Sequence, residues 1–163
     1  MRLVELTARK PLDYKNFFLQ GLRDHPDCFR TSPADELWAY FPTEGTTESF
    51  TLAAVSNQAE IMGVVSFERE TSVNMRHKAL LYRMYVGLNF AGQGIGKMLI
   101  NNTINRARQL SGLEQIYLTV IATNTKAKNL YQSFGFESFS HEKNAIKTPA
   151  GNYYHEEQMV LFL

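Results

Sequence analysis

A mixed α/β fold is predicted by three features of the sequence. Strand-like and helix-like runs of apolar residues follow one another along the whole chain. A glycine-rich turn at residues 91–97 joins the strand-like run 79–86 to a long helical run. The 163 residues, 44% of them hydrophobic, suffice for one domain with a proper core. We therefore expect residues 1–163 to form a single α/β (α+β) domain.

Seven strands are expected from period-two alternation, or from short apolar runs bounded by turn residues. They cover residues 2–8, 50–56, 61–70, 79–86, 114–121, 136–140 and 154–162. The run 114–121 follows the run 79–86 through a turn and a helix, which predicts a parallel crossover between these two strands. The polar residues 144–153 are expected to connect the last two strands.

Four helices are expected from apolar residues spaced three and four positions apart. They cover residues 11–23, 32–41, 94–110 and 126–134. Ser32, followed by proline, is typical of a helix start, and Asn124 is expected to cap the last helix. The aromatic residues Trp38, Tyr40 and Phe41 of the second helix either pack onto the sheet or line a substrate mouth.

Charge and cysteine content narrow the function classes. The formal net charge is +1, so neither nucleic acid nor a membrane surface is an expected partner. No apolar run is long enough to span a bilayer, and no signal-like region follows Met1. The single cysteine, Cys28, excludes an internal disulfide, and we interpret it as a small packing residue rather than a catalytic thiol. We expect a cytoplasmic protein.

The glycine-rich turn predicts a phosphate site, because the N–H groups of a helix's first turn have no internal partner and carry partial positive charge. A P-loop would place Ser or Thr after the helix-start lysine, but Met98 follows Lys97. A dinucleotide-binding turn would follow the first strand, with a different glycine spacing. Both alternatives are therefore disfavoured.

Two runs of the sequence carry a family resemblance. The first is Met84-Tyr85-Val86, three residues, then Phe90-Ala91-Gly92-Gln93-Gly94-Ile95-Gly96-Lys97-Met98-Leu99. The second is Leu118-Thr119-Val120, then Asn124, Ala127, Leu130-Tyr131 and Gly135-Phe136. Together they resemble the two motifs of the GCN5-related N-acetyltransferases (GNAT), and the order of elements over nearly all of the chain is also similar. The resemblance implies a mostly antiparallel sheet of six to seven strands, about four flanking helices and a splayed central parallel pair.

The resemblance implies acetyl-CoA as the cosubstrate and no metal. It assigns the pantetheine arm to the backbone of Met84, Tyr85 and Val86, with Asn124 and Ala127 beside the arm. It assigns the pyrophosphate to the backbone of Ala91, Gly92, Gln93, Gly94, Ile95, Gly96 and Lys97. The family usually has Gln or Arg at position 91, so Ala91 removes a side-chain contact worth on the order of 1 kcal/mol. Three lysines, Lys97, Lys126 and Lys128, either meet the adenosine phosphates or form a solvated helix face.

The resemblance also implies catalytic roles. Tyr131 matches the tyrosine that protonates the CoA thiolate, and a phenol with a pKa of about 10 keeps its proton at neutral pH. Its other interpretation is a packed aromatic residue. For the general base we select Glu68, which shares a strand face with Glu70. His77, His155 and Glu156 are alternatives, and some members of the family release the proton to water.

The sequence therefore predicts an N-acetyltransferase that moves an acetyl group from acetyl-CoA to a primary amine of a small molecule or peptide. The alternative is a non-catalytic acyl-CoA binding or sensing module, favoured by Ala91 and disfavoured by Tyr131. The amine is unidentified. An acidic acceptor site would suit a cationic amine; its candidates are Glu36, Glu44, Glu48, Glu68 and Glu70. A homodimer paired through the last strand is compatible with the resemblance.

Overall fold

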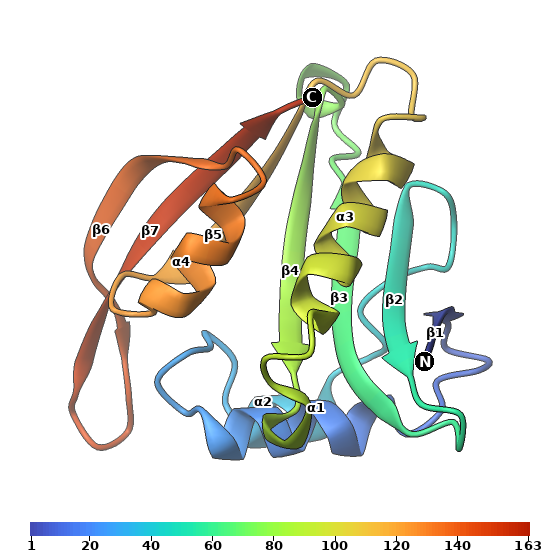
Figure 1. The fold of residues 1–163 in the computed structure, drawn as a ribbon. Helices are drawn as coiled ribbons and strands as arrows, with labels where there is room; N and C mark the ends of the chain where they lie inside the picture. The colour runs from blue at the N-terminus through green and yellow to red at the C-terminus, as the bar shows by residue number, and fades with distance from the viewer.

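A seven-stranded sheet forms the centre of the computed structural model, which describes residues 1–163 (Figure 1). The strand order is β1-β2-β3-β4-β5-β7-β6, and every neighbouring pair is antiparallel except β4 and β5. The strands are β1 (Arg2–Leu6), β2 (Ser49–Val55), β3 (Ile61–Arg69), β4 (Lys78–Val86), β5 (Gln115–Ile121), β6 (Glu137–Lys147) and β7 (Tyr153–Phe162). The predicted mostly antiparallel sheet with a central parallel pair is thus confirmed.

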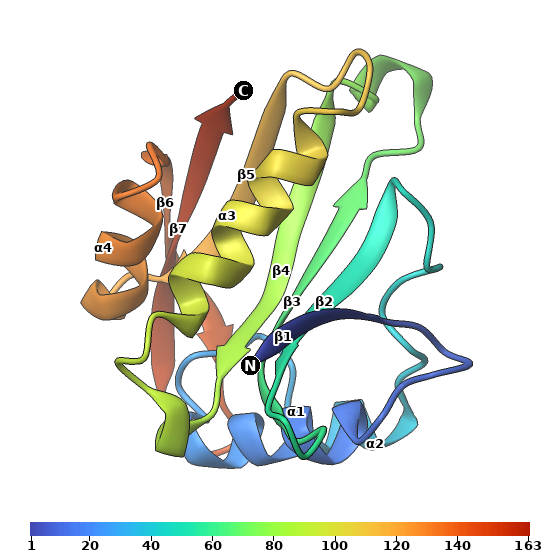
Figure 2. The ribbon, with the colours of Figure 1, turned by 45° about the vertical axis from the view of Figure 1, so that its right-hand side comes forward.

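Four α-helices flank the sheet. They are α1 (Tyr14–Asp24), α2 (Pro33–Trp38), α3 (Ile95–Ala107) and α4 (Thr125–Gln132), with 3₁₀ turns η1 (Val73–Met75) and η2 (Leu88–Phe90). Helices α3 and α4 cover one face, whereas α1 and α2 lie across the end of the sheet where β4 finishes (Figures 1 and 2). Separate apolar clusters lie beneath α3 and beneath α1, and the α1 cluster covers only the β1–β4 part of the face opposite α3.

The parallel pair β4 and β5 is splayed, as predicted. Pairing between these strands is confined to Lys78–Leu80 of β4 and Gln115–Tyr117 of β5. Beyond this point the strands diverge toward their carboxyl ends (Figure 1). The remainder of β4 keeps its partner β3 on one side and has no strand partner on the other. The sheet therefore divides into two arms, β1–β4 and β5–β7, which meet at one end.

A bulge in β4 changes which side chains face each layer. Ser66 of β3 pairs with Tyr82 and Val64 pairs with Tyr85, so β4 carries one extra residue between these pairs. Arg83 lies at the bulge with a left-handed φ of 51°. Before the bulge, Leu81 faces the α3 cluster; after it, Tyr85 joins the α1 cluster. The bulge thus reverses the period-two alternation within one strand.

Two helix boundaries differ from the sequence prediction. Helix α1 begins at Tyr14 rather than residue 11, because Leu12 has a left-handed φ of 48° and breaks the first predicted turn. Helix α2 ends at Trp38, and Ala39 is already extended. The predicted cap at Ser32 is confirmed, since its hydroxyl accepts from the Asp35 N–H while Asp35 reaches back to the Ser32 N–H.

Of the two alternatives for the aromatic residues of the second helix, packing onto the sheet is wrong for Trp38 and Tyr40. The two side chains are 87% and 95% exposed, because α2 buries a different position, Glu36. Strand β6 is also longer than predicted. It extends into the first part of the expected connection 144–153, since it pairs with β7 as far as Lys147. No helix is both long and apolar enough to cross a membrane.

Candidate active site

The glycine-rich turn presents free backbone donors at the start of α3. Gly92 and Gly94 have left-handed φ values of 79° and 78°, and a Cβ on either would meet no atom within 4 Å. Gly94 is the N-cap of α3 but has no side chain to cap it. The first N–H of this helix to find an acceptor is that of Met98, which donates to the Gly94 carbonyl. The N–H groups of residues 95–97 therefore remain available, and this donor set fits a pyrophosphate.

The side chains around the turn contribute less than its backbone. Ala91 is exposed, and its N–H donates to the Leu88 carbonyl. Gln93 folds back, donating to the Asn89 carbonyl at 3.3 Å. Gly96 allows the start of α3 to approach α4 closely, because a Cβ there would lie 3.1 Å from Leu130 Cδ2. A phosphate at this turn would be held chiefly by the main chain.

The three lysines near the turn differ in their exposure and ion pairing. Lys97 and Lys126 are exposed and form no ion pair. Lys128 instead pairs with Glu157 of β7 at 2.6 Å, so this candidate for the adenosine phosphates is already occupied. The hydrogen bond from Lys128, followed by that from Ser138, lowers the pKa of Glu157.

The carboxyl-terminal part of β4 borders the gap between the two arms. Tyr85 and Val86 pair with Val64 and Gly63 of β3 on one side only. The peptide groups of residues 84–86 that face β5 have no strand partner, since pairing with β5 ends at Leu80. An extended ligand could hydrogen-bond to this edge as an added strand does.

Tyr131 lies on the inner face of α4, where it belongs to the α3 cluster. It is 7% exposed and packs edge-on against Phe136 with ring centroids 5.8 Å apart. Its hydroxyl makes no hydrogen bond within the protein. Burial raises the pKa of Tyr131 above that of a free tyrosine. The phenol is therefore neutral, and its proton is not committed to another group.

Asn124 begins α4, as the sequence predicts. Its Oδ1 accepts from the Ala127 N–H at 3.1 Å, which confirms the cap. Its Nδ2 contacts Cys28 Sγ at 3.6 Å, so the loop between α1 and α2 reaches the other arm here. The pKa of Cys28 is raised to about 11, first by burial and then by Asp27, which leaves a thiol rather than a thiolate.

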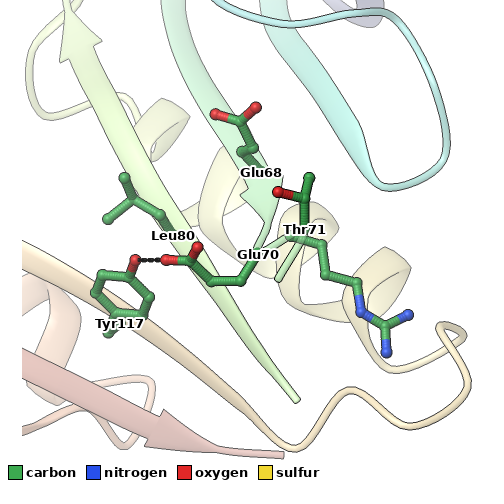
Figure 3. Close-up of a pocket in the computed structure, with 6 residues that line it drawn as sticks. Glu68, Glu70, Thr71, Leu80 and Tyr117 are labelled. Atoms are coloured by element: carbon green, nitrogen blue, oxygen red, sulfur yellow. Dashed lines mark hydrogen bonds between the residues drawn. The ribbon is translucent and has the colours of Figure 1, made fainter. Parts of the chain in front are cut away.

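A pocket of about 170 Å³ lies where the arms meet, on the face opposite α3 (Figure 3). Glu68, Glu70, Leu80 and Tyr117 line it, and Glu70 and Tyr117 point toward one another. Tyr117 donates a hydrogen bond to Glu70. Tyr82 lies beside Glu68, with its hydroxyl 3.3 Å from Glu68 Oε2 and 2.7 Å from the Pro42 carbonyl oxygen.

Two carboxylates, Glu68 and Glu70, and one guanidinium, Arg69, line this pocket. Neither Glu68 nor Glu70 forms an ion pair, and the intervening Arg69 binds Glu48 instead. Burial, followed by the adjacent carboxylates, raises the pKa of both Tyr82 and Tyr117. Glu68 and Glu70, predicted to share a strand face, both line this pocket. The two tyrosines were missed, because nothing in the sequence places them opposite these glutamates.

The other predicted acids and bases lie outside this pocket, and most of them have partners of their own. Glu156 is buried and accepts from Arg30 at 2.6 Å. His155 Nδ1 accepts from the Asn144 N–H at 2.8 Å. Glu36 is buried against Arg83. Glu48 binds Arg69 and Arg76, while Glu44 is exposed and His77 is partly buried. The five-residue acidic set therefore reduces to Glu68 and Glu70 at the pocket.

Arg83 is the functional candidate that sequence reasoning missed most completely. Its Nη1 donates to both Glu36 oxygens at 2.8 Å and lies 3.3 Å from the Tyr14 hydroxyl. Burial opposes the charged form of Arg83, but the bonds with Glu36 and Tyr14 outweigh it and raise the pKa. Burial also raises the pKa of Tyr14 to about 12, against the opposing effect of Arg83. A lone arginine in the apolar run 79–86 was the available signal.

Comparison with known proteins relates this geometry to one family. The sequence model described as "Acetyltransferase (GNAT) family" matches residues 18–136. A probable spermine N(1)-acetyltransferase of Bacillus subtilis subsp. natto is 30% identical over 79 residues, covering 45% of this chain and 52% of that protein. A ribosomal protein bS18-alanine N-acetyltransferase of Haemophilus ducreyi is 34% identical over 86 residues, covering 53% and 59%. The chain thus spans little more than half the length of these curated relatives.

Solved structures show the same fold over the full chain. A GNAT superfamily phosphinothricin acetyltransferase from Sinorhizobium meliloti, determined in complex with acetyl-CoA, superposes with a TM-score of 0.82. The match covers 99% of this chain and 88% of that one at 17% identity. At this identity the likeness establishes the fold, and the chemistry must be argued from the residues.

Proposed function

Because the chain belongs to the GNAT acetyltransferase family, we propose that it moves an acetyl group from acetyl-CoA to a primary amine by direct transfer. The observation that carries the proposal is the alignment of free backbone donors with an unpaired strand edge. The unpaired edge of β4 borders the gap between the two arms. The free N–H groups of residues 95–97 lie at one end of this gap. We propose one catalytic domain over residues 1–163, located in the cytoplasm.

The proposed donor site is built mainly from backbone. The turn 91–97 holds the pyrophosphate, chiefly through the free N–H groups of residues 95–97, and the edge of residues 84–86 holds the pantetheine arm. Asn124 and Ala127 flank the arm from the opposite side of the gap. Acetyl-CoA supplies the acetyl thioester when it is bound. The missing side chain at Ala91 removes one of several donors, which is compatible with a functional site.

The proposed chemistry requires two proton transfers. A bond forms between the amine nitrogen and the acetyl carbon, and the bond from that carbon to sulfur breaks. Glu68 takes the proton that the amine loses, directly or through water. Tyr131 gives its phenolic proton to the leaving sulfur and later regains one from solvent. The neutral, unpartnered hydroxyl of Tyr131 supports this role.

The proposed acceptor is a cationic amine of a small molecule or peptide. Glu68 and Glu70 line one pocket without a basic partner, so a substrate with a second positive charge would gain from both carboxylates. One related protein is named for spermine, which is such a compound, and another for the alanine of a ribosomal protein. Neither name alone selects the acceptor of this chain.

The alternative function, a non-catalytic acyl-CoA binding module, rests on Ala91 and is separated by two measurements. Isothermal titration first measures acetyl-CoA binding by the wild-type protein. A free-CoA assay then tests polyamines, aminoglycosides, amino acids and peptides. Binding with turnover supports the enzyme, binding without turnover supports the module, and absence of binding contradicts both.

The role of Glu68 is tested in the same assay. Glu68→Gln should lower kcat by roughly 10²-fold, the scale of one general base. The matched control is Glu44→Gln, because Glu44 is exposed and lies outside the pocket. Equal turnover in the two variants would rule out Glu68 as the base.

A homodimer is also part of the proposal, but not one paired through the last strand. Strand β7 is hydrogen-bonded to β5 on one side and to β6 on the other, so it has no free edge. The free edge of this arm belongs to β6. Light scattering on the purified protein tests the dimer, and a monomer at all concentrations would contradict it.

A further inference from the structure

The most unusual backbone position beside the proposed donor site is Arg83. Its left-handed φ of 51° is uncommon for a residue with a long side chain. It lies at the bulge of β4, three residues before the strand ends. Such strained positions persist when the surroundings hold them, and they gather at functional sites.

The side chain of Arg83 shows what holds this conformation. Its guanidinium group binds both carboxylate oxygens of Glu36 at 2.8 Å and lies 4.8 Å above the ring of Phe18. The Arg83 and Glu36 side chains are 17% and 3% exposed, so the ion pair is largely removed from water. The two residues are 47 positions apart in the chain. A helix at the end of the sheet is thus tied to the middle of β4.

The bulge determines how the last residues of β4 are presented. After it, Met84 and Val86 lie against the α3 cluster, and both would be within 4 Å of a Cβ at Gly96. Tyr85 turns to the other face, where its ring lies 5.1 Å from that of Phe17 and its hydroxyl donates to Asp24. Without the extra residue this alternation would be reversed. The unpaired edge of residues 84–86 would then present different peptide groups to the gap.

We infer that Arg83 and Glu36 are a positioning pair that locks the β4 bulge and couples α2 to the strand edge that holds the acetyl donor. The inference rests on the proposed function, because it assigns that edge to the pantetheine arm. Neither side chain is placed against the thioester. Their role is to fix the edge relative to α2, so that the donor is held in one geometry.

The test compares variants of this pair in the full chain. Arg83→Ala removes the anchor and leaves a strained φ, Arg83→Gly removes the anchor but tolerates that φ, and Glu36→Gln weakens the pair. The control is Phe50→Leu, a core change in β2 where Phe50 stacks on Phe67 in the α3 cluster, whereas Arg83 lies over Phe18 of the α1 cluster. Thermal unfolding, acetyl-CoA affinity by titration, kcat and both KM values are measured for each.

A positioning role predicts a loss of kcat that is larger than the loss of thermal stability explains. Arg83→Ala should lower kcat at least tenfold, and Arg83→Gly should lower kcat by a smaller factor. At a comparable loss in Tm, each should lose more kcat than Phe50→Leu. The reason is that a small misplacement of a reacting group lowers the rate by a large factor. The KM for the amine should change less than kcat. Variants whose kcat equals that of wild type, or falls only in line with Tm, would overturn the inference.

Hydrogen exchange separates this inference from the proposed function. Glu36→Gln should speed amide exchange in residues 83–87 as well as in α2, with or without any acetyl-CoA. If the wild-type protein binds no acetyl-CoA, the proposed function fails while this coupling can still be measured. If the protein binds acetyl-CoA and exchange in 83–87 is unchanged in Glu36→Gln, the positioning pair is refuted and the function stands. Should Arg83→Ala not fold, Glu36→Gln alone gives both readouts.

Discussion

Tyr131 combines the properties that a proton donor to a thiolate needs. It is buried on the inner face of α4, its hydroxyl has no protein partner, and burial raises its pKa, so the proton is present at neutral pH. Tyr82 and Tyr117 also have raised pKa values, but their hydroxyls already bond to protein acceptors. Of these three phenols, Tyr131 is the one whose proton is free to leave.

Replacing Tyr131 with Phe should therefore lower kcat by roughly 10²-fold, the usual scale of general acid catalysis. The KM for acetyl-CoA should stay within about twofold, because the ring and its packing on Phe136 remain. Thermal stability should not fall, since the lost hydroxyl makes no hydrogen bond. Free-CoA release and thermal unfolding measure these effects. The exposed Tyr153→Phe serves as control, and full turnover in Tyr131→Phe would remove this residue from the mechanism.

At the scale of elements, the glycine turn and α3 act as one unit. The left-handed φ of Gly94 ends the turn and starts the helix, so that the first N–H groups of α3 point outward without a cap. A side chain at this position would strain the backbone even though space is open around it. The geometry of the donors thus depends on one backbone conformation.

Gly94→Ala should weaken acetyl-CoA binding by about tenfold, because a non-glycine residue costs roughly 1–2 kcal/mol in this conformation and the turn will shift to relieve it. Titration calorimetry measures the affinity. Gly151→Ala is a matched control, since Gly151 has a similar φ of 85° with open space in the distant β6–β7 hairpin. Both variants should lose similar stability. Equal affinity in the two would contradict the assignment of the turn.

The ion pair between Lys128 of α4 and Glu157 of β7 should contribute to the loss of stability at acid pH. The pKa of Glu157 is lowered in the folded state, chiefly by Lys128. The ionised carboxylate therefore adds to the free energy of unfolding above the unfolded-state pKa of about 4.3, and this contribution is lost as the pH falls through the folded-state pKa. Glu157→Gln should be less stable at pH 7 by about 0.5–1.5 kcal/mol. Its unfolding free energy should also fall less steeply between pH 6 and pH 3. Urea titrations at several pH values measure both, and parallel pH profiles would contradict this account.

At the scale of the whole molecule, the proposed donor site depends on the division of the sheet into the two arms β1–β4 and β5–β7. They are paired for three residues of β4 and then part, and the proposed donor lies between them. A ligand in this gap would contact the glycine turn, the β4 edge and α4 at once. It would therefore link parts of the fold that strand pairing leaves separate.

Acetyl-CoA should consequently stabilise the folded protein. At a concentration 100 times its Kd, a ligand that binds only the native state adds about 2.7 kcal/mol, which corresponds to roughly 5–11 °C in Tm for a domain of this size. Differential scanning fluorimetry with an extrinsic dye measures the shift. Gly94→Ala should show a smaller shift at the same concentration. The absence of any shift in wild type would argue against binding in the gap.

Most strands, the helix caps and the glycine turn could be predicted from the sequence, because local periodicity and turn chemistry determine them. The polar strand β6 could not be predicted to its full length, since its pairing with β7 rather than its own pattern defines it. The links from Arg83 to Glu36 and from Arg30 to Glu156 span 47 and 126 positions, and no local pattern encodes such contacts. These two contacts removed Glu36 and Glu156 from the candidate site residues, and the ion pair with Glu157 removed Lys128.

The exposed end of α2 has a practical consequence. Trp38 is the single tryptophan of the chain and is 87% exposed, so its fluorescence should resemble that of indole in water. It follows Glu36 by two residues on the helix that Arg83 ties to β4. The protein thus carries its own optical reporter on the helix that the proposed positioning pair couples to the donor edge. A blue shift or quenching of this emission on adding an amine would follow events at α2 without any label.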